Sequence, residues 1–253
     1  MKSCKIFKLL HLKFDVSEVK ELTIFRRRFL CIDIESSCIE YGEPDFQIET
    51  PFSYALNIQV KTLKVLNYLE MCQIHQINFN TLIPKLDLSE LRQLSVSLEF
   101  QLKPDLMAMI FPHSLERLDF MSEPQLHVNP AVLAFERCLN IRDISMSYLT
   151  KKVLVSRKEF KKIVRIKRNA KLNFGLLTTL TNIDPEDIVK LVDDHVVKDG
   201  KFAFYFMGEN SQNYLESKNY IEIIAEQRKQ KGIIPKSLVA LLCGKNARYH
   251  QSL

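Results

Sequence analysis

The sequence predicts an α/β solenoid, in which a curved parallel sheet carries helices on its convex side and ends in a C-terminal helical cap. Three observations support this fold class. Short apolar–x–apolar triplets recur through residues 1–207, the stretches between several of them carry helix signals, and residues 208–253 look largely helical. We therefore expect an α/β repeat array over 1–207 and a helical cap over 208–253.

Each triplet predicts a strand, because alternate side chains of a strand share one face. The two apolar residues then point into the core and the middle residue points out. The triplets begin on average about every 27 residues, which is a period typical of α/β repeats. They are Leu12-Lys13-Phe14, Ile32-Asp33-Ile34, Leu66-Asn67-Tyr68, Leu94-Ser95-Val96, Leu118-Asp119-Phe120, Ile144-Ser145-Met146, Leu172-Asn173-Phe174 and Phe204-Tyr205-Phe206.

Several triplets have a further apolar residue three positions earlier, as Leu91 before Leu94 and Leu115 before Leu118. This residue would lie in the approach to the strand and turn inward. The segment Phe111-Pro-His-Ser-Leu-Glu-Arg-Leu-Asp-Phe120 places a proline turn directly before such an LxxLxL motif.

With this motif the chain resembles the leucine-rich-repeat family across residues 8–207. The resemblance implies a protein–protein interaction scaffold, and similar arrays recognise substrates in F-box-type ubiquitin-ligase complexes. Residues 1–40 show no F-box motif, so an adaptor would be recruited in trans. The family places Asn three residues after the last strand leucine, whereas this chain has Met71, Glu99, Glu123 and Leu149 there. The alternative is another kind of α/β stack.

Helices are predicted between the strands. Ser17–Phe25 has helical spacing, and Pro104–Ile110 and Pro130–Cys138 look like short helices. Asp184-Pro185-Glu186-Asp187 supplies an N-cap aspartate, a proline at the first helical position and acids in the first turn. Gly200 fits a C-terminal cap for this helix, directly before a strand at Phe202–Phe206.

The C-terminal segment predicts two more helices, at Asn213–Lys231 and at Pro235–Cys243. A solenoid exposes the apolar face of its last repeat unless another element covers it. We therefore expect this helical pair to cap the array.

The outward strand positions predict a concave binding face. It combines acidic, basic and neutral side chains, which suits a protein partner better than a phosphate backbone. The residues expected to bind are Arg117, Asp119, Asp143, Ser145, Asn173 and Tyr205. The other outward positions are His11, Lys13, Asp15, Cys31, Asp33, Glu35, Asn67, Gln93, Ser95, Ser97, Ser147 and Lys171.

A basic segment at 151–171 offers the alternative function. It holds ten Lys or Arg residues and one Glu, in a chain with a net charge of +6. Phe160, Ile163 and Val164 share one helical face, which leaves the cations on the other sides. Binding of nucleic acid or of another anionic surface is the alternative that this segment supports. Its basic patch comprises Lys158, Lys161, Lys162, Arg165, Lys167 and Arg168.

Composition and motifs favour a non-catalytic protein without a cofactor or metal. We find no phosphate-binding glycine loop and no nucleophile motif, and Asp193-Asp194-His195 on a helix points its side chains in different directions. The six cysteines are scattered, which predicts reduced thiols in a cytoplasmic or nuclear protein. We expect neither a signal peptide nor a membrane span, and a protein that is monomeric or part of a hetero-complex.

Overall fold

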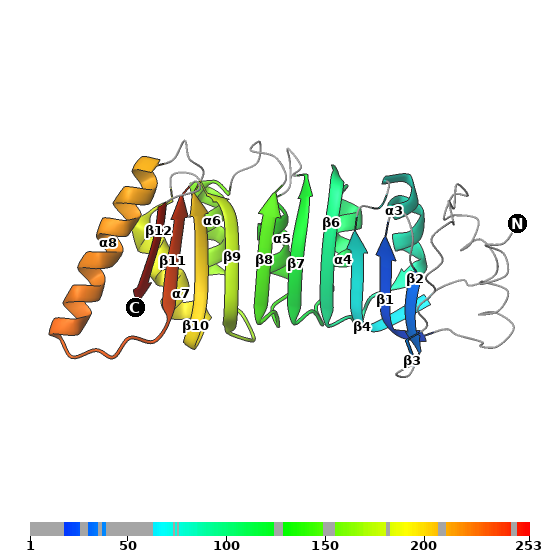
Figure 1. Cartoon of the computed structure of the whole chain (residues 1–253), viewed down its shortest axis with the longest axis horizontal. Helices are drawn as coiled ribbons and strands as arrows, with labels where there is room; N and C mark the ends of the chain where they lie inside the picture. Colours follow the sequence, from blue (N-terminus) through cyan, green and yellow to red (C-terminus); the bar gives the residue numbers. More distant parts are fainter. Residues whose placement is uncertain are drawn as a thin grey trace, which may run out of the picture.

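One long sheet runs through the described residues, and from β6 to β12 its strands follow one another in chain order (Figure 1). The computed structural model describes residues 18–25, 30–34, 37–38, 63–72, 74, 76–123, 129–148, 155–180, 183–206, 211–243 and 247–253. The strands are β1 (Glu18–Phe25), β2 (Leu30–Ile34), β3 (Ser37–Cys38), β4 (Leu63–Cys72), β5 (Leu86–Asp87), β6 (Gln93–Gln101), β7 (Arg117–Glu123), β8 (Asp143–Tyr148), β9 (Leu172–Leu180), β10 (Val196–Phe206), β11 (Leu238–Cys243) and β12 (Ala247–Ser252).

The sheet is parallel in its interior and antiparallel at its ends. Its order is β12-β11-β10-β9-β8-β7-β6-β4-β1-β2-β3, with β5 beside β4. Strands β1, β4 and β6 to β11 are mutually parallel, whereas β2 and β12 run in the opposite direction to their neighbours. The α/β prediction is confirmed at this level: the chain forms a mostly parallel, open sheet with helices between the strands.

Helices connect successive strands and lie on one face of the sheet (Figure 1). Parallel strands need such crossovers, because a tight turn can join only antiparallel neighbours. The helical elements are α3 (Gln76–Leu82), the short turn η1 (Ile83–Lys85), α4 (Pro104–Ile110), α5 (Pro130–Arg137), α6 (Arg157–Arg165), α7 (Pro185–His195) and α8 (Ser211–Gln230). The predicted helices at Pro104–Ile110, Pro130–Cys138 and Asn213–Lys231 are thus confirmed to within one or two residues.

The core forms where two rows of inward side chains cross the strands at matched register. The first row aligns Leu69, Leu94, Leu118, Ile144, Gly175, Phe202 and Val239. The second row aligns Met71, Val96, Phe120, Met146, Leu177, Phe204 and Leu241. Both rows are buried against the helices, for example Phe120 against Phe111 (ring centroids 5.3 Å apart) and Phe204 against Phe160 (5.9 Å).

A backbone hydrogen bond recurs where the chain enters each strand. The N–H groups of Glu116, Arg142 and Asn173 each donate to the carbonyl of the equivalent residue one repeat earlier, at 2.7 Å in all three cases. Leu91, Leu115 and Ile141 directly precede Arg92, Glu116 and Arg142, the carbonyl acceptors of these bonds. All three apolar side chains are fully buried. The expectation that the third apolar residue of the motif turns inward is therefore confirmed.

Two predicted helices are strands. Ser17–Phe25 contains β1, where a register shift between Val19 and Glu21 sets Val65 opposite Val19 and Leu69 opposite Leu22. This shift reproduces the three-residue spacing that suggested a helix. Pro235–Cys243 contains β11, a short apolar run between β10 and β12. Periodicity cannot distinguish such a run from a buried helix.

Strand β11 also bears on the predicted division at residue 207. It pairs with β10 along six residues, so the sheet continues across this boundary. Among the described residues of the predicted helical cap, α8 is the one helix, and it packs on α7, β11 and β12.

In two strands, the residues that face the core differ from the predicted ones. In β4 the inward residues are Leu69 and Met71 rather than Leu66 and Tyr68. In β9 the inward residue is Gly175, and Phe174 lies 37% exposed on the opposite face. A Cβ atom on Gly175 would lie 2.1 Å from Cε2 of Phe202. The ring of Phe202 therefore occupies the space that an inward side chain would need.

Helix α7 begins at the predicted residue, but the hydrogen bonding of its N-cap and the position of its C-terminal end differ from the prediction. Asp184 is its N-cap residue as predicted, but its side chain makes no capping hydrogen bond. The helix ends at His195, and Gly200 lies within β10 rather than at the helix C-terminus. The triplet Leu12-Lys13-Phe14 lies outside the described residues.

Replacing Gly175 by Ala should destabilise the protein. Both Gly175 and Phe202 are buried, so the added methyl group has no free space. We expect the free energy of unfolding to fall by about 1–3 kcal/mol, measured by urea denaturation. The same substitution in a Phe202→Leu background should cost much less. Equal costs in the two backgrounds, compared in a double-mutant cycle, would disprove this packing relation.

Candidate binding surfaces

The first candidate surface is the face of the sheet opposite α4 to α7, which we call the open face (Figure 1). Strand register brings Arg117 beside Asp143 and Asp119 beside Ser145, as their predicted role requires. Arg117 and Asp119 are exposed, and Asp143 and Ser145 are half-buried. The outward positions are Tyr68, Glu70, Gln93, Ser95, Ser97, Arg117, Asp119, Met121, Asp143, Ser145, Ser147, Phe174, Leu176, Thr178, Lys201, Ala203, Tyr205, Leu238, Ala240 and Leu242.

The part of the open face on β4 to β8 is polar. Tyr68 of β4 lies beside Gln93 on the neighbouring strand and is influenced by several charged and polar groups of this region. Burial raises the pKa of the Tyr68 phenol, and the negative charge of Glu70 raises it further. A hydrogen bond with Ser95 and the positive charge of Arg117 act in the opposite direction. Acid, base and hydroxyl groups therefore interact across three strands.

The part of the open face on β9 to β11 is largely apolar, which the strand triplets did not predict. Phe174 lies beside Asp143 and Lys201, and Leu176 lies beside Ser145 and Ala203. Tyr205 is in this region as predicted, half-buried and next to Leu242. Asn173 is exposed but precedes the aligned row, whose place Phe174 takes. The continuous apolar run Phe174 to Leu177 was the signal for a strand with apolar residues on both faces.

Several predicted outward positions cannot be placed on the open face. His11, Lys13, Asp15 and Glu35 lie outside the described residues. Cys31 and Asp33 belong to β2, which runs antiparallel to β1 and thus outside the parallel series.

The second candidate surface is helix α6 of the basic segment. Phe160, Ile163 and Val164 are buried, which confirms the predicted inner face. The helix starts with a reciprocal capping box: Ser156 Oγ accepts from the Glu159 N–H (3.3 Å), and the Glu159 carboxylate accepts from the Ser156 N–H (2.8 Å). The Ser-x-x-Glu spacing was the sequence signal for this start.

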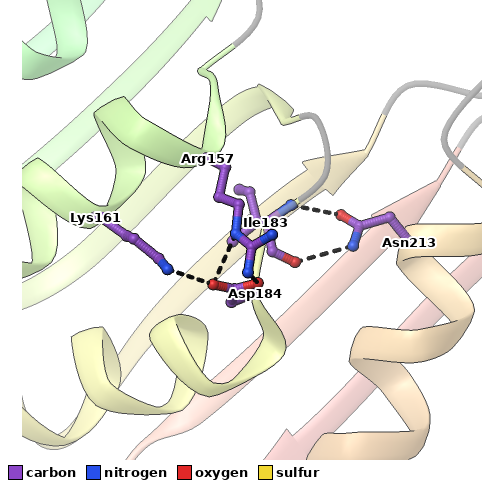
Figure 2. A network of polar contacts seen from close by, with 5 residues as sticks. All are labelled: Arg157, Lys161, Ile183, Asp184 and Asn213. Atoms are coloured by element: carbon purple, nitrogen blue, oxygen red, sulfur yellow. Dashed lines mark hydrogen bonds and ion pairs between the residues drawn. The ribbon is translucent and has the colours of Figure 1, made fainter.

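Acidic neighbours neutralise much of the charge on α6 (Figure 2). Asp184 accepts from Arg157 Nε at 2.9 Å and lies 2.7 Å from Lys161 Nζ. The hydrogen bond from Lys161, followed by that from Arg157, holds the pKa of Asp184 below its ordinary value of 3.8. Lys162 pairs in the same way with Glu136 of α5, at 2.6 Å. These cations join α6 to its neighbouring repeats.

Arg168 does not belong to an exposed basic patch. Its Nη2 donates to the carbonyl of Ile141 at 2.5 Å, and its guanidinium lies 5.1 Å from the centre of the Phe135 ring. Burial lowers the pKa of Arg168 to about 10, so the residue remains a cation at neutral pH. Arg168, which was expected in the basic patch, is thus half-buried, because the turn after α6 brings its guanidinium over Phe135 of α5.

The remaining cations of the basic patch are at opposite ends of α6. Lys158 is exposed in the first turn, whereas Arg165 and Lys167 are exposed at the C-terminal end. The latter two line a shallow groove with Lys171 and Lys190. Since helix C-termini carry partial negative charge, part of this positive charge stabilises the ends of α6 and α7.

Asn213 of α8 fixes the loop that leads into α7 (Figure 2). Its amide accepts from the Ile183 N–H (3.0 Å) and donates to the Ile183 carbonyl (2.9 Å). Both groups are buried, and Asp184 follows directly. One short segment thus ties α6, α7 and α8 together.

The histidine and cysteine side chains form no recognisable reactive site in the described ranges. His195 is buried and its Nε2 donates to the Val164 carbonyl at 2.9 Å, which satisfies an end carbonyl of α6. Cys72, Cys138 and Cys243 are free thiols, and burial raises the pKa of Cys138 to about 12. No three His, Cys, Asp or Glu side chains come together as a metal site there, and no helix is long and apolar enough to cross a membrane.

Comparison of the chain with known protein families, with curated proteins and with solved structures gives no match. Its function must therefore be argued from the surfaces described above.

Replacing Asn213 by Ala should loosen the attachment of α8. The substitution leaves the buried N–H and carbonyl groups of Ile183 without their partners, so we expect the free energy of unfolding to fall by about 1–3 kcal/mol. Thermal or urea unfolding measures this. Gln212→Ala is the matched control, because Gln212 is exposed on the same helix turn and should cost less than about 0.5 kcal/mol. Similar losses of unfolding free energy for both variants would show that the Asn213–Ile183 hydrogen bonds do not stabilise the fold.

Asp184→Asn should remove a pH-dependent part of the stability. Because the folded pKa of Asp184 lies below 3.8, its ion pairs stabilise the fold above that pH and are lost as the pH falls through the folded value. At pH 7 we expect the variant to lose about 0.5–1 kcal/mol in urea unfolding. This difference from the original protein should disappear in strong acid. Asp194→Asn, at an exposed carboxylate of the same helix, is the control; a loss that persists in acid would contradict the ion-pair account.

Proposed function

We propose that this protein is a leucine-rich-repeat-like solenoid that acts as a non-catalytic protein-binding module, with the open face as its binding surface. The repeated entry bond of the strands, the buried LxxLxL residues and the sequential order of β6 to β12 support the solenoid. The reversed strands β2 and β12 and the helix α8 serve as its caps, because they end the parallel series.

The helix-free face of the sheet carries this proposal. Parallel sheets are ordinarily covered on both faces by their crossover helices. Here the helices of the described residues lie on one face (Figure 1). Arg117, Asp119 and Phe174 are exposed on the other face. A surface with apolar residues at one end and mixed charges at the other has the composition of a protein interface.

Nucleic-acid binding through 151–171 is the less well supported function. Arg157, Lys161 and Lys162 form ion pairs with Asp184 and Glu136, and Arg168 is engaged with the core. Among the described cations of this segment, the exposed Lys158, Arg165, Lys167 and Lys171 are left for phosphates. Such binding should weaken steeply between low and physiological salt, which separates it from recognition by the open face.

The test is affinity purification of the intact protein from its native cells, with and without nuclease. We expect the copurifying proteins to survive nuclease and to be lost from an Arg117→Glu/Asp119→Lys variant, because these exposed side chains centre on the open face. A Lys158→Glu/Arg165→Glu variant of α6 is the matched control and should retain them. If the α6 variant loses the partners and the open-face variant keeps them, the proposed surface is wrong. Loss of all partners with nuclease would favour the nucleic-acid function instead.

A further inference from the structure

The loop between α8 and β11 exposes two large aliphatic side chains in succession. Ile233 is 46% exposed and Ile234 is 76% exposed, the highest value for a large hydrophobic residue among those described. The loop lies at the edge of the sheet where β9, β10 and β11 begin, along the bottom of Figure 1.

This exposure is fixed by the backbone at both ends of the loop. Gly232 has a φ of 69°, and it ends α8 with hydrogen bonds from its own N–H to Lys229 (3.0 Å) and from the Ile233 N–H to Arg228 (2.9 Å). A helix end of this kind normally packs the residue after the glycine back onto the helix. On the other side, the Lys236 carbonyl accepts from the Asp199 N–H. The isoleucines therefore project from a held loop.

Lysines surround this aliphatic tip. Lys231 and Lys236 are exposed on the loop itself, and Lys229 is exposed in the last turn of α8. Lys198 is exposed in the irregular first part of β10, to which the loop is bonded through Asp199. None of the four has an ion pair within the described ranges. Asp199 is the one acid in residues 196–201 and 229–238, so these two segments carry a clear excess of positive charge. Lys167 and Lys171 are exposed just before β9 and add to the cations that precede these strands.

We propose that the loop Lys231–Lys236 docks on the surface of an anionic lipid bilayer. Ile233 and Ile234 would enter the interfacial region, and the flanking lysines would contact the negatively charged headgroups. Aliphatic burial and lysine–headgroup attraction are the two contributions from which peripheral membrane binding is built. This binding goes beyond the protein-binding function and uses a different edge of the molecule, so the open face stays accessible.

The tip favours a bilayer over a nucleic acid. Single-stranded nucleic acids bind through aromatic side chains on which bases stack, together with a basic groove. Here the residues among the lysines are aliphatic, and they would remain in water on a phosphate backbone. A bilayer takes up both kinds of side chain at once.

Fluorescence of a single tryptophan tests the insertion, because the chain contains no Trp. On vesicles of phosphatidylcholine with phosphatidylserine at low salt, Ile234→Trp should show a blue-shifted emission that brominated lipids quench. It should show little change on phosphatidylcholine alone. Ile223→Trp is the matched control, because Ile223 is 56% exposed on α8 outside the loop, and its emission should not shift. No shift for Ile234→Trp, or an equal shift for Ile223→Trp, would overturn the proposal.

Vesicle cosedimentation of the tryptophan-free protein tests both contributions separately. Ile233→Ser/Ile234→Ser should weaken binding to anionic vesicles at least about tenfold. Lys231→Glu/Lys236→Glu should abolish the preference for anionic over neutral vesicles, whereas Lys158→Glu on α6 should keep it. If the lysine variant instead loses binding to an RNA oligonucleotide while no variant or parent binds vesicles, the edge is a nucleic-acid site and the membrane proposal fails.

Discussion

The register between neighbouring parallel strands is the constraint on which the rest of the structure depends. It is set where the chain enters each strand, by the bond from Glu116, Arg142 or Asn173 to the repeat before it. A slip of one residue would move every apolar side chain of a strand to the opposite face. The buried residue just before each entry bond, such as Leu115, resists that slip, because it has a place only in the core.

Matched register has a functional consequence, since it gives the sheet two continuous but different faces. The inward rows bury leucine, methionine and phenylalanine against the helices, and the outward rows form the open face. The change from polar to apolar side chains along that face follows the change in strand composition between β8 and β9. A partner that crosses this boundary would make polar contacts at one end and apolar contacts at the other.

The basic side chains also fall into two groups, those that form ion pairs within the fold and those that remain exposed. Cations of α6, such as Arg157 and Lys162, form ion pairs with carboxylates of the neighbouring helical segments and hold α5, α6 and α7 together. Cations at the edge where β9 to β11 begin, such as Lys231 and Lys236, meet no carboxylate in the described residues and remain available to a partner. The total charge of the sequence does not distinguish these groups, because the distinction lies in which side chains become neighbours.

The sequence by itself determined the elements whose signals are local. The LxxLxL motifs of β6 to β8 and the proline starts of α4, α5 and α7 are contained in short segments, so the core face and much of the open face, including Arg117 and Asp119, could be predicted. Only the tertiary structure decided the rest. β11 is a strand because β10 and β12 flank it, and Phe174 faces outward because the Phe202 ring fills the space beside Gly175. Both outcomes depend on side chains and strands that come from other parts of the chain. The periodicity within one segment carries no information about those neighbours.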